Sequence, residues 1–144
     1  MNADDEERFE ELAAALLARP EVLDGYVFGS QARGEAQAHS DLDVAVFVDR
    51  ERVAEAPFGY AAELGAVLSA ALHRERIDIV VLNDAPPLLY QRVLQDGVRL
   101  VSRDPKATAG REGYALSRYC DYLPQLRKIE AAHRARIARG DFGR

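Results

Sequence analysis

The segment "GSQARGEAQAHSDLDVAVFV", residues 29–48, carries most of the information about the fold. Asp41 and Asp43 stand two positions apart at the start of an apolar run that ends at Val48. Another apolar stretch, residues 26–28, ends directly before Gly29 and Ser30. Short apolar runs bounded by glycine and polar residues are typical of buried strands. The segment therefore predicts two strands, with a Gly-Ser after the first and paired carboxylates at the start of the second.

Working outward, the chain alternates helices and strands. We expect strands over 22–28, 42–48, 77–82 and 98–102, and helices over residues up to Pro20, from Ser30, from Pro57 to about His73, from Asn83-Asp84 to Gly97, and over 105–139. Pro57 fits a first helical turn, Asn83-Asp84 can cap the next helix, and Pro124 should break or kink the last one. This alternation is typical of an α/β fold around one central sheet, whose strand order does not follow from the sequence.

Length and composition favour one soluble domain. A chain of 144 residues suits a single domain, 1–144, with a core over 1–104 and a C-terminal helical segment over 105–144. No apolar run approaches the roughly 20 residues that span a bilayer, and the acidic start does not resemble a signal peptide. Cys120 is the only cysteine, so no disulfide is expected within the chain. We therefore expect a cytoplasmic protein without membrane contact.

The charge is unevenly distributed. The net charge of −5 argues against direct nucleic-acid binding. Residues 127–144, however, hold six arginines or lysines and two acids. This basic tail is either a solvated helix face, which is the commoner case, or a docking surface for a partner. Tyr114, Tyr119 and Tyr122 in the preceding segment have two interpretations as well, core packing being favoured over interface anchoring.

The paired aspartates predict a metal site. Alternate residues of a strand share a face, so Asp41 and Asp43 lie about 7 Å apart on the same side. Two carboxylates this close repel each other and raise each other's pKa unless a cation neutralises them. Hard oxygen ligands on a rigid strand suit Mg²⁺, which keeps its other positions for water and substrate phosphates.

Asp78 is the candidate for a third carboxylate. It interrupts the apolar run 77–82, where an unpartnered carboxylate is costly to bury. If this strand lies beside the second strand, three carboxylates converge, which is enough to hold two metal ions for a phosphoryl transfer. The alternative is an edge position at which Asp78 simply faces water.

Gly29 and Ser30 are suited to binding a phosphate. Gly29 has no Cβ, so a phosphate can approach the backbone closely. Ser30 would open a helix, whose free N–H groups and positive dipole end favour an anion. Arg33 lies about one helical turn from Ser30 and can help to neutralise a triphosphate.

The spacing Gly29-Ser30, ten residues, Asp41-Leu42-Asp43 resembles the signature of the polymerase-beta-like nucleotidyltransferases. The residues at 32–34 and Ser40 resemble the minimal, MNT-type members, and segments 82–89 and 119–124 look like those of MntA antitoxins, which pair with HepT toxins. The resemblance implies a small mixed sheet flanked by helices. It also implies Mg²⁺, in two ions, on Asp41, Asp43 and Asp78, with Asp78 assisting the acceptor hydroxyl.

The resemblance further implies an activity, because MntA-like proteins transfer AMP from ATP to a tyrosine of the HepT ribonuclease. The short chain leaves little structure for a small-molecule acceptor pocket, which favours an acceptor on a partner protein. Two alternatives stay open. One is a stand-alone nucleotidyltransferase that acts on a small molecule or RNA, and the other is a non-catalytic antitoxin that inhibits by binding alone.

Overall fold

The computed structural model describes residues 3–29, 42–73 and 76–140. In chain order the elements are helix α1 (Ala3–Leu17), strands β1 (Val22–Phe28) and β2 (Leu42–Val48), the short 3-10 helix η1 (Arg50–Arg52), helix α2 (Tyr60–Leu72), strand β3 (Ile77–Val81), the short 3-10 helix η2 (Leu82–Asp84), helix α3 (Pro87–Asp96), strand β4 (Val98–Ser102) and helix α4 (Pro105–Ala138). The four expected strands are therefore confirmed, as is the α/β class.

The four strands form one mixed sheet in the order β3-β2-β1-β4. β1 runs antiparallel to both of its neighbours, whereas β2 and β3 are parallel and are joined through α2. β3 and β4 are the two edge strands among the described residues. The order places the strand of Asp78 directly beside the strand of Asp43, which the sequence left undecided.

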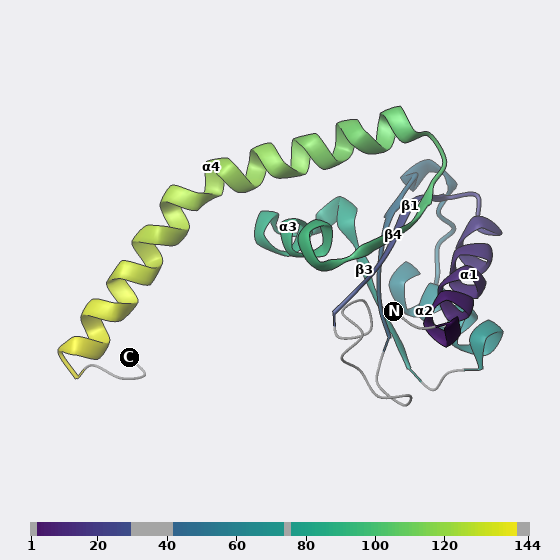
Figure 1. Ribbon diagram of the computed structural model, residues 1–144, viewed down its shortest axis with the longest axis horizontal. Helices are drawn as coiled ribbons and strands as arrows, with labels where there is room; N and C mark the ends of the chain where they lie inside the picture. Colours follow the sequence, from purple (N-terminus) through teal and green to yellow (C-terminus); the bar gives the residue numbers. More distant parts are fainter. Residues whose placement is uncertain (1–2, 30–41, 74–75, 141–144) are drawn as a thin grey trace.

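Helices cover both faces of the sheet, α1 and α2 on one side and α3 with the first half of α4 on the other (Figure 1). Side chains of β2 alternate between the two cores. Val44 and Val46 are buried with residues of α1 and α2, whereas Ala45 is buried with residues of α3 and α4. The central strand is thus apolar on both faces, which explains its continuous apolar run.

A buried ionic cluster fixes the start of α4 to the sheet. Asp24 of β1 is completely buried and accepts hydrogen bonds from the Thr108 hydroxyl at 2.6 Å and from Arg111 Nε and Nη2 at 2.7 and 2.9 Å. The bonds to Asp24 raise the pKa of Arg111, whose guanidinium carbon lies 5.1 Å from the centre of the Phe47 ring. A buried charge needs such a partner, so this cluster holds α4 in place.

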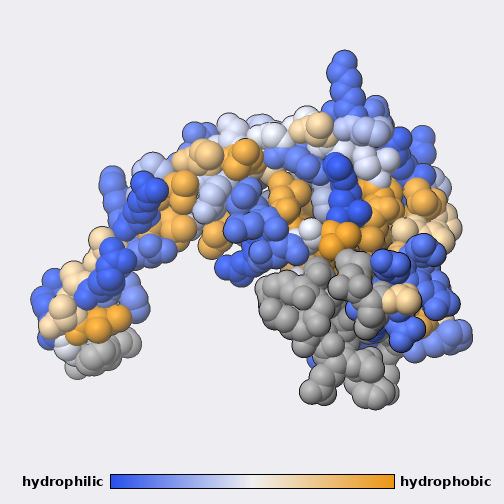
Figure 2. All heavy atoms as spheres, viewed as in Figure 1, coloured by the Kyte–Doolittle hydropathy of each residue, from blue (hydrophilic) through white to orange (hydrophobic). Residues whose placement is uncertain are grey.

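The second half of α4 extends away from the sheet (Figure 1). Every residue from 127 to 140 is exposed. Figure 2 shows that hydrophilic residues dominate this projecting half, with hydrophobic side chains set among them. Two of its hydrophobic side chains, Ile129 and Ile137, are about half exposed.

Two expected helix features differ in the structure, whereas the kink expected for the helix that contains Pro124 is present. Pro57 does not start α2, which begins three residues later after Gly59, because a glycine at φ 90° supplies the turn. Asn83 does not cap α3; its side chain instead bonds the backbone N–H and C=O of Val48 at 3.0 and 2.8 Å. α4 continues through Pro124 rather than breaking there, and its axis bends in the middle, as expected for a helix that contains a proline (Figure 1).

Candidate functional site

Asp43 and Asp78 occupy neighbouring positions on two parallel strands. The register of β2 and β3 pairs these two residues directly. Adjacent strands lie about 4.8 Å apart, and paired residues project from the same face of the sheet. Two carboxylates from strands separated in sequence are therefore brought together, as the metal-site prediction requires.

Gly29 lies against Asp43, one member of this carboxylate pair. Phe28, the residue before it, pairs with Asp43 across β1 and β2. Gly29 adopts φ +77°, in the left-handed region that favours glycine, and a Cβ placed there would lie 2.5 Å from Asp43 Oδ2. Glycine at this position accommodates the Asp43 carboxylate, and the approach of a phosphate to the Gly29 backbone stays a prediction. The space that a side chain would fill lies directly beside a candidate metal-ligating oxygen.

Asp78 is less buried than its apolar strand implied. Its side chain is 49% exposed because β3 is an edge strand, and Arg76 Nε lies 3.6 Å from its Oδ1. An exposed ion pair of this kind contributes little to stability. Asp78 is therefore an edge residue rather than a buried charge, as one of its two interpretations allowed. Its exposure agrees with the water-facing interpretation, but its pairing with Asp43 favours a role in the site.

Ser30, Arg33 and Asp41 lie outside the described residues, as does the helix expected to start at Ser30. Within residues 3–29, 42–73 and 76–140 no three acidic, histidine or cysteine side chains are grouped to hold a metal. The structure thus describes two of the three proposed carboxylates and brings those two together. Asp41 precedes β2 by one position, so it stays a predicted member of the site.

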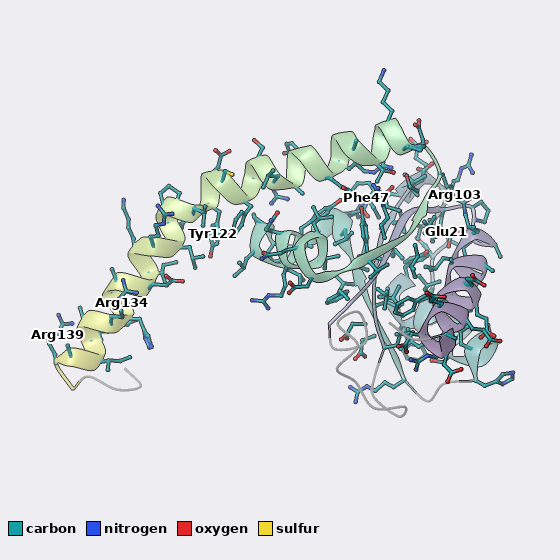
Figure 3. All side chains as sticks on the ribbon, in the orientation of Figure 1. Glu21, Phe47, Arg103, Tyr122, Arg134 and Arg139 are labelled. Carbon is teal, nitrogen blue, oxygen red and sulfur yellow. The ribbon has the colours of Figure 1, made fainter. Side chains whose placement is uncertain are left out.

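Of the three tyrosines considered on α4, Tyr114 differs from the favoured interpretation, which was core packing. Tyr114 is 69% exposed, so core packing does not explain it. Tyr119 and Tyr122 are partly buried. Figure 3 places Tyr122, Arg134 and Arg139 along the middle and projecting parts of α4.

Sequence reasoning missed the buried cluster of Asp24, Thr108 and Arg111. Asp24 interrupts the apolar strand 22–28, as Asp78 interrupts its own strand, and this was the available signal. Its partners are 84 and 87 residues away, so no local pattern identifies them. Of the two strand aspartates, Asp24 is the buried and structural one, whereas Asp78 is exposed beside Asp43.

The fold and the paired carboxylates belong to a class of enzymes that transfer nucleotidyl groups. The sequence profile described as "Polymerase beta, Nucleotidyltransferase" matches residues 10–106. The chain therefore belongs to the polymerase beta nucleotidyltransferase family, and the prediction of a nucleotidyltransferase is confirmed. No curated protein matches the chain at a significant level.

Solved structures agree with this fold. A structure assigned as a minimal nucleotidyltransferase is 33% identical, with a TM-score of 0.53, covering 68% of this chain and 95% of that one. An MNT antitoxin in complex with a tri-AMPylated HEPN toxin of Shewanella oneidensis is 21% identical, with a TM-score of 0.66, covering 89% and 97%. A toxin–antitoxin structure with AMP-PNP is 22% identical, with a TM-score of 0.60, covering 90% and 95%.

In the described part of the chain, no helix is long and apolar enough to cross a membrane.

Proposed function

We propose that this nucleotidyltransferase is an antitoxin that transfers AMP from ATP to a tyrosine of a HepT-like ribonuclease toxin and thereby silences it. The observation that carries the proposal is the pairing of Asp43 with Asp78 beside Gly29. The fold likeness to an MNT antitoxin bound to an AMPylated toxin supports the choice of acceptor.

The residues at the site fit a divalent cation. Asp43 and Asp78 bring carboxylates from adjacent strands to one face, and the missing Cβ of Gly29 gives Asp43 Oδ2 the space that it occupies. We propose that Asp41, Asp43 and Asp78 hold Mg²⁺, with two ions when ATP is bound. Bound Mg²⁺ neutralises the triphosphate and stabilises the charge that develops during transfer.

The predicted site residues then have the following proposed roles. Gly29, Ser30 and Arg33 bind the triphosphate, and Asp78 accepts the proton of the attacking tyrosine hydroxyl. A bond forms between the tyrosine oxygen and the α-phosphorus. The bond from that phosphorus to the bridging oxygen breaks, and pyrophosphate leaves. Because Asp78 is half exposed, an acceptor from another protein can reach it, and its carboxyl group can release the proton to solvent.

The modification would inactivate the toxin through charge. AMP adds bulk and a negative phosphate, which repels an RNA backbone at the toxin's active site. The net charge of −5 makes direct RNA binding by this chain unfavourable, and a reaction that consumes ATP suits the cytoplasm. The alternatives are a stand-alone enzyme acting on a small molecule or RNA, and inhibition by binding alone.

We also propose that the C-terminal segment, 105–144, docks the partner while 1–104 forms the catalytic core. The projecting half of α4 carries Arg127, Lys128, Arg134, Arg136 and Arg139 against the single acid Glu130 over 127–139. An acidic surface on the toxin would complement this charge and speed the encounter of the two proteins.

Magnesium-dependent ATP binding separates an enzyme from a purely binding antitoxin. Titration calorimetry with a non-hydrolysable ATP analogue should show binding that needs Mg²⁺ and that Asp43→Asn weakens at least about tenfold, because an amide is a poorer ligand than a carboxylate. Asp84→Asn is the matched control, since Asp84 is exposed and pairs with Arg50 on η1. If the ATP analogue bound equally well with and without Mg²⁺, or equally well to Asp43→Asn and Asp84→Asn, the result would argue for inhibition by contact.

A further inference from the structure

An open depression of about 360 Å³ lies between α2 and the edge strand β3. Its walls are formed by small side chains of α2 and by the start of β3. The lining residues are Ala61, Ala62, Gly65, Ala66 and Ser69 of α2, with Arg76, Ile77, Asp78 and Ile79. None of the helix side chains is larger than a serine, so the depression exists because this face of α2 lacks bulk.

Close packing at Gly65 brings the helix to the strand. Gly65 is buried, and a Cβ built on it would lie 3.0 Å from the Ile77 carbonyl oxygen and 3.5 Å from the Ile79 side chain. Ala62 and Ala66, at the same wall, are exposed. The helix therefore lies near the backbone of β3 while its small side chains leave the space beside the strand edge open.

The depression and the proposed catalytic site share one residue, Asp78. Asp78 lines the depression and also pairs with Asp43 across β2 and β3. No strand among the described residues pairs with the outer edge of β3. A residue of an added strand placed opposite Asp78 would lie on the same face of the sheet as Asp78 and Asp43. The three residues would form one row across the strands.

We infer that the acceptor tyrosine reaches the site on an extended segment of the partner protein that adds to the outer edge of β3. This inference rests on the proposed function and identifies the acceptor subsite. An added strand would pair its backbone with β3, about 4.8 Å away. The tyrosine opposite Asp78 would project on the carboxylate face, and the residues on either side of it would project toward α2 and fill the depression.

The lining chemistry favours a peptide over a nucleic acid. Among the lining residues that the structure describes, Arg76 is the one cationic side chain, and its Nε lies 3.6 Å from Asp78 Oδ1. A phosphate backbone bound there would meet Asp78 without a cluster of cations to offset the repulsion. A strand edge with small neighbouring side chains offers backbone hydrogen bonds and shallow side-chain pockets, which suit an extended peptide.

A leucine in the depression tests the inference. Ala66→Leu places a larger side chain in the depression, whereas Ala71→Leu adds the same side chain at an exposed position of α2 that does not line the depression. With purified HepT-like toxin, ATP and Mg²⁺, Ala66→Leu should raise the KM for the toxin by about tenfold or more, whereas nucleotide affinity stays within about twofold of wild type. Ala71→Leu should match wild type in both, and equal KM values for the two variants would overturn the inference.

Hydrogen exchange gives a readout independent of turnover. In the complex of the wild-type chain with the toxin and a non-hydrolysable ATP analogue, amides of β3, residues 77–81, should exchange more slowly than in the free chain. Unchanged exchange across β3 in a formed complex would refute the added strand. Failure of the proposed function looks different, because the wild-type chain would then leave the toxin unmodified at every concentration.

Discussion

Gly29→Ala tests whether the geometry beside Asp43 is needed for nucleotide transfer. The new Cβ would lie 2.5 Å from Asp43 Oδ2, whereas real Cβ contacts essentially never fall below 3.0 Å. The difference, 3.0 − 2.5 Å, means that the carboxylate must retreat by at least 0.5 Å. Since a misplacement of about 1 Å can cost about 100-fold in rate, a loss of about tenfold or more is expected.

The same substitution also strains the backbone, and a second glycine isolates that effect. Gly29 has φ +77° and Gly59 has φ +90°, but a Cβ on Gly59 would meet nothing within 4 Å. Each alanine variant should lose about 1–3 kcal/mol of folding stability, because alanine is strained at positive φ. Only Gly29→Ala should lose nucleotide transfer when both variants are still folded.

The assay is AMP transfer to the toxin at saturating ATP, run beside urea unfolding of each variant. Temperatures should be chosen at which both variants are at least about 95% folded by the measured stability. If Gly29→Ala transfers AMP as fast as Gly59→Ala, the close contact with Asp43 plays no part in the chemistry. The assignment of Gly29 to the site would then be wrong.

Three further predictions concern the site and the packing of α4. Asp78→Ala should lower kcat at least about 100-fold while nucleotide affinity falls only modestly, because Asp43 is kept; lost binding with kcat preserved at saturation would point to a different third carboxylate. Asp24→Ala should cost about 3 kcal/mol in urea unfolding by leaving Arg111 without its charge partner, and a loss below about 1 kcal/mol would contradict that role. Burial raises the pKa of Tyr90 to about 12, whereas an exposed tyrosine titrates near 10. The neutral hydroxyl therefore stabilises the fold below pH 10, and this contribution is lost as the pH rises toward 12. Tyr90→Phe should lose less stability than wild type between pH 10 and 12, and an equal fall of unfolding free energy with pH in both proteins would contradict this.

The strands were predictable because their signals are local. Short apolar runs bounded by glycine or polar residues define 22–28 and 42–48, and both strands have these bounds in the structure. The start of α2 was missed because Pro57 and Gly59 both offer plausible starts, and the backbone at Gly59 decides between them. Local patterns therefore locate elements better than they locate element ends.

The candidate site residues could be named from the sequence, whereas their arrangement could not. The spacing of Gly29 and Asp43 is visible in the sequence, whereas the pairing of Asp43 with Asp78 depends on strand order. Strand order follows from how α2 packs across the sheet, which is a long-range property. For the same reason the exposure of Asp78 and the pairing of Asp24 with Arg111 could not be derived from local sequence.

Covalent modification of the partner distinguishes the proposed enzyme from an antitoxin that inhibits by binding alone. The most direct measurement is the intact mass of a HepT-like toxin co-expressed with the wild-type chain or with Asp43→Asn, together with the growth of the cells. We expect the toxin to gain one or more AMP units with wild type and none with Asp43→Asn, with growth rescued only by wild type. Asp43→Asn should bind the toxin and, without Mg²⁺, melt no lower than wild type, because it removes a carboxylate repulsion. A toxin of unmodified mass in both cultures, with growth rescued in both, would contradict the account and show inhibition by binding alone.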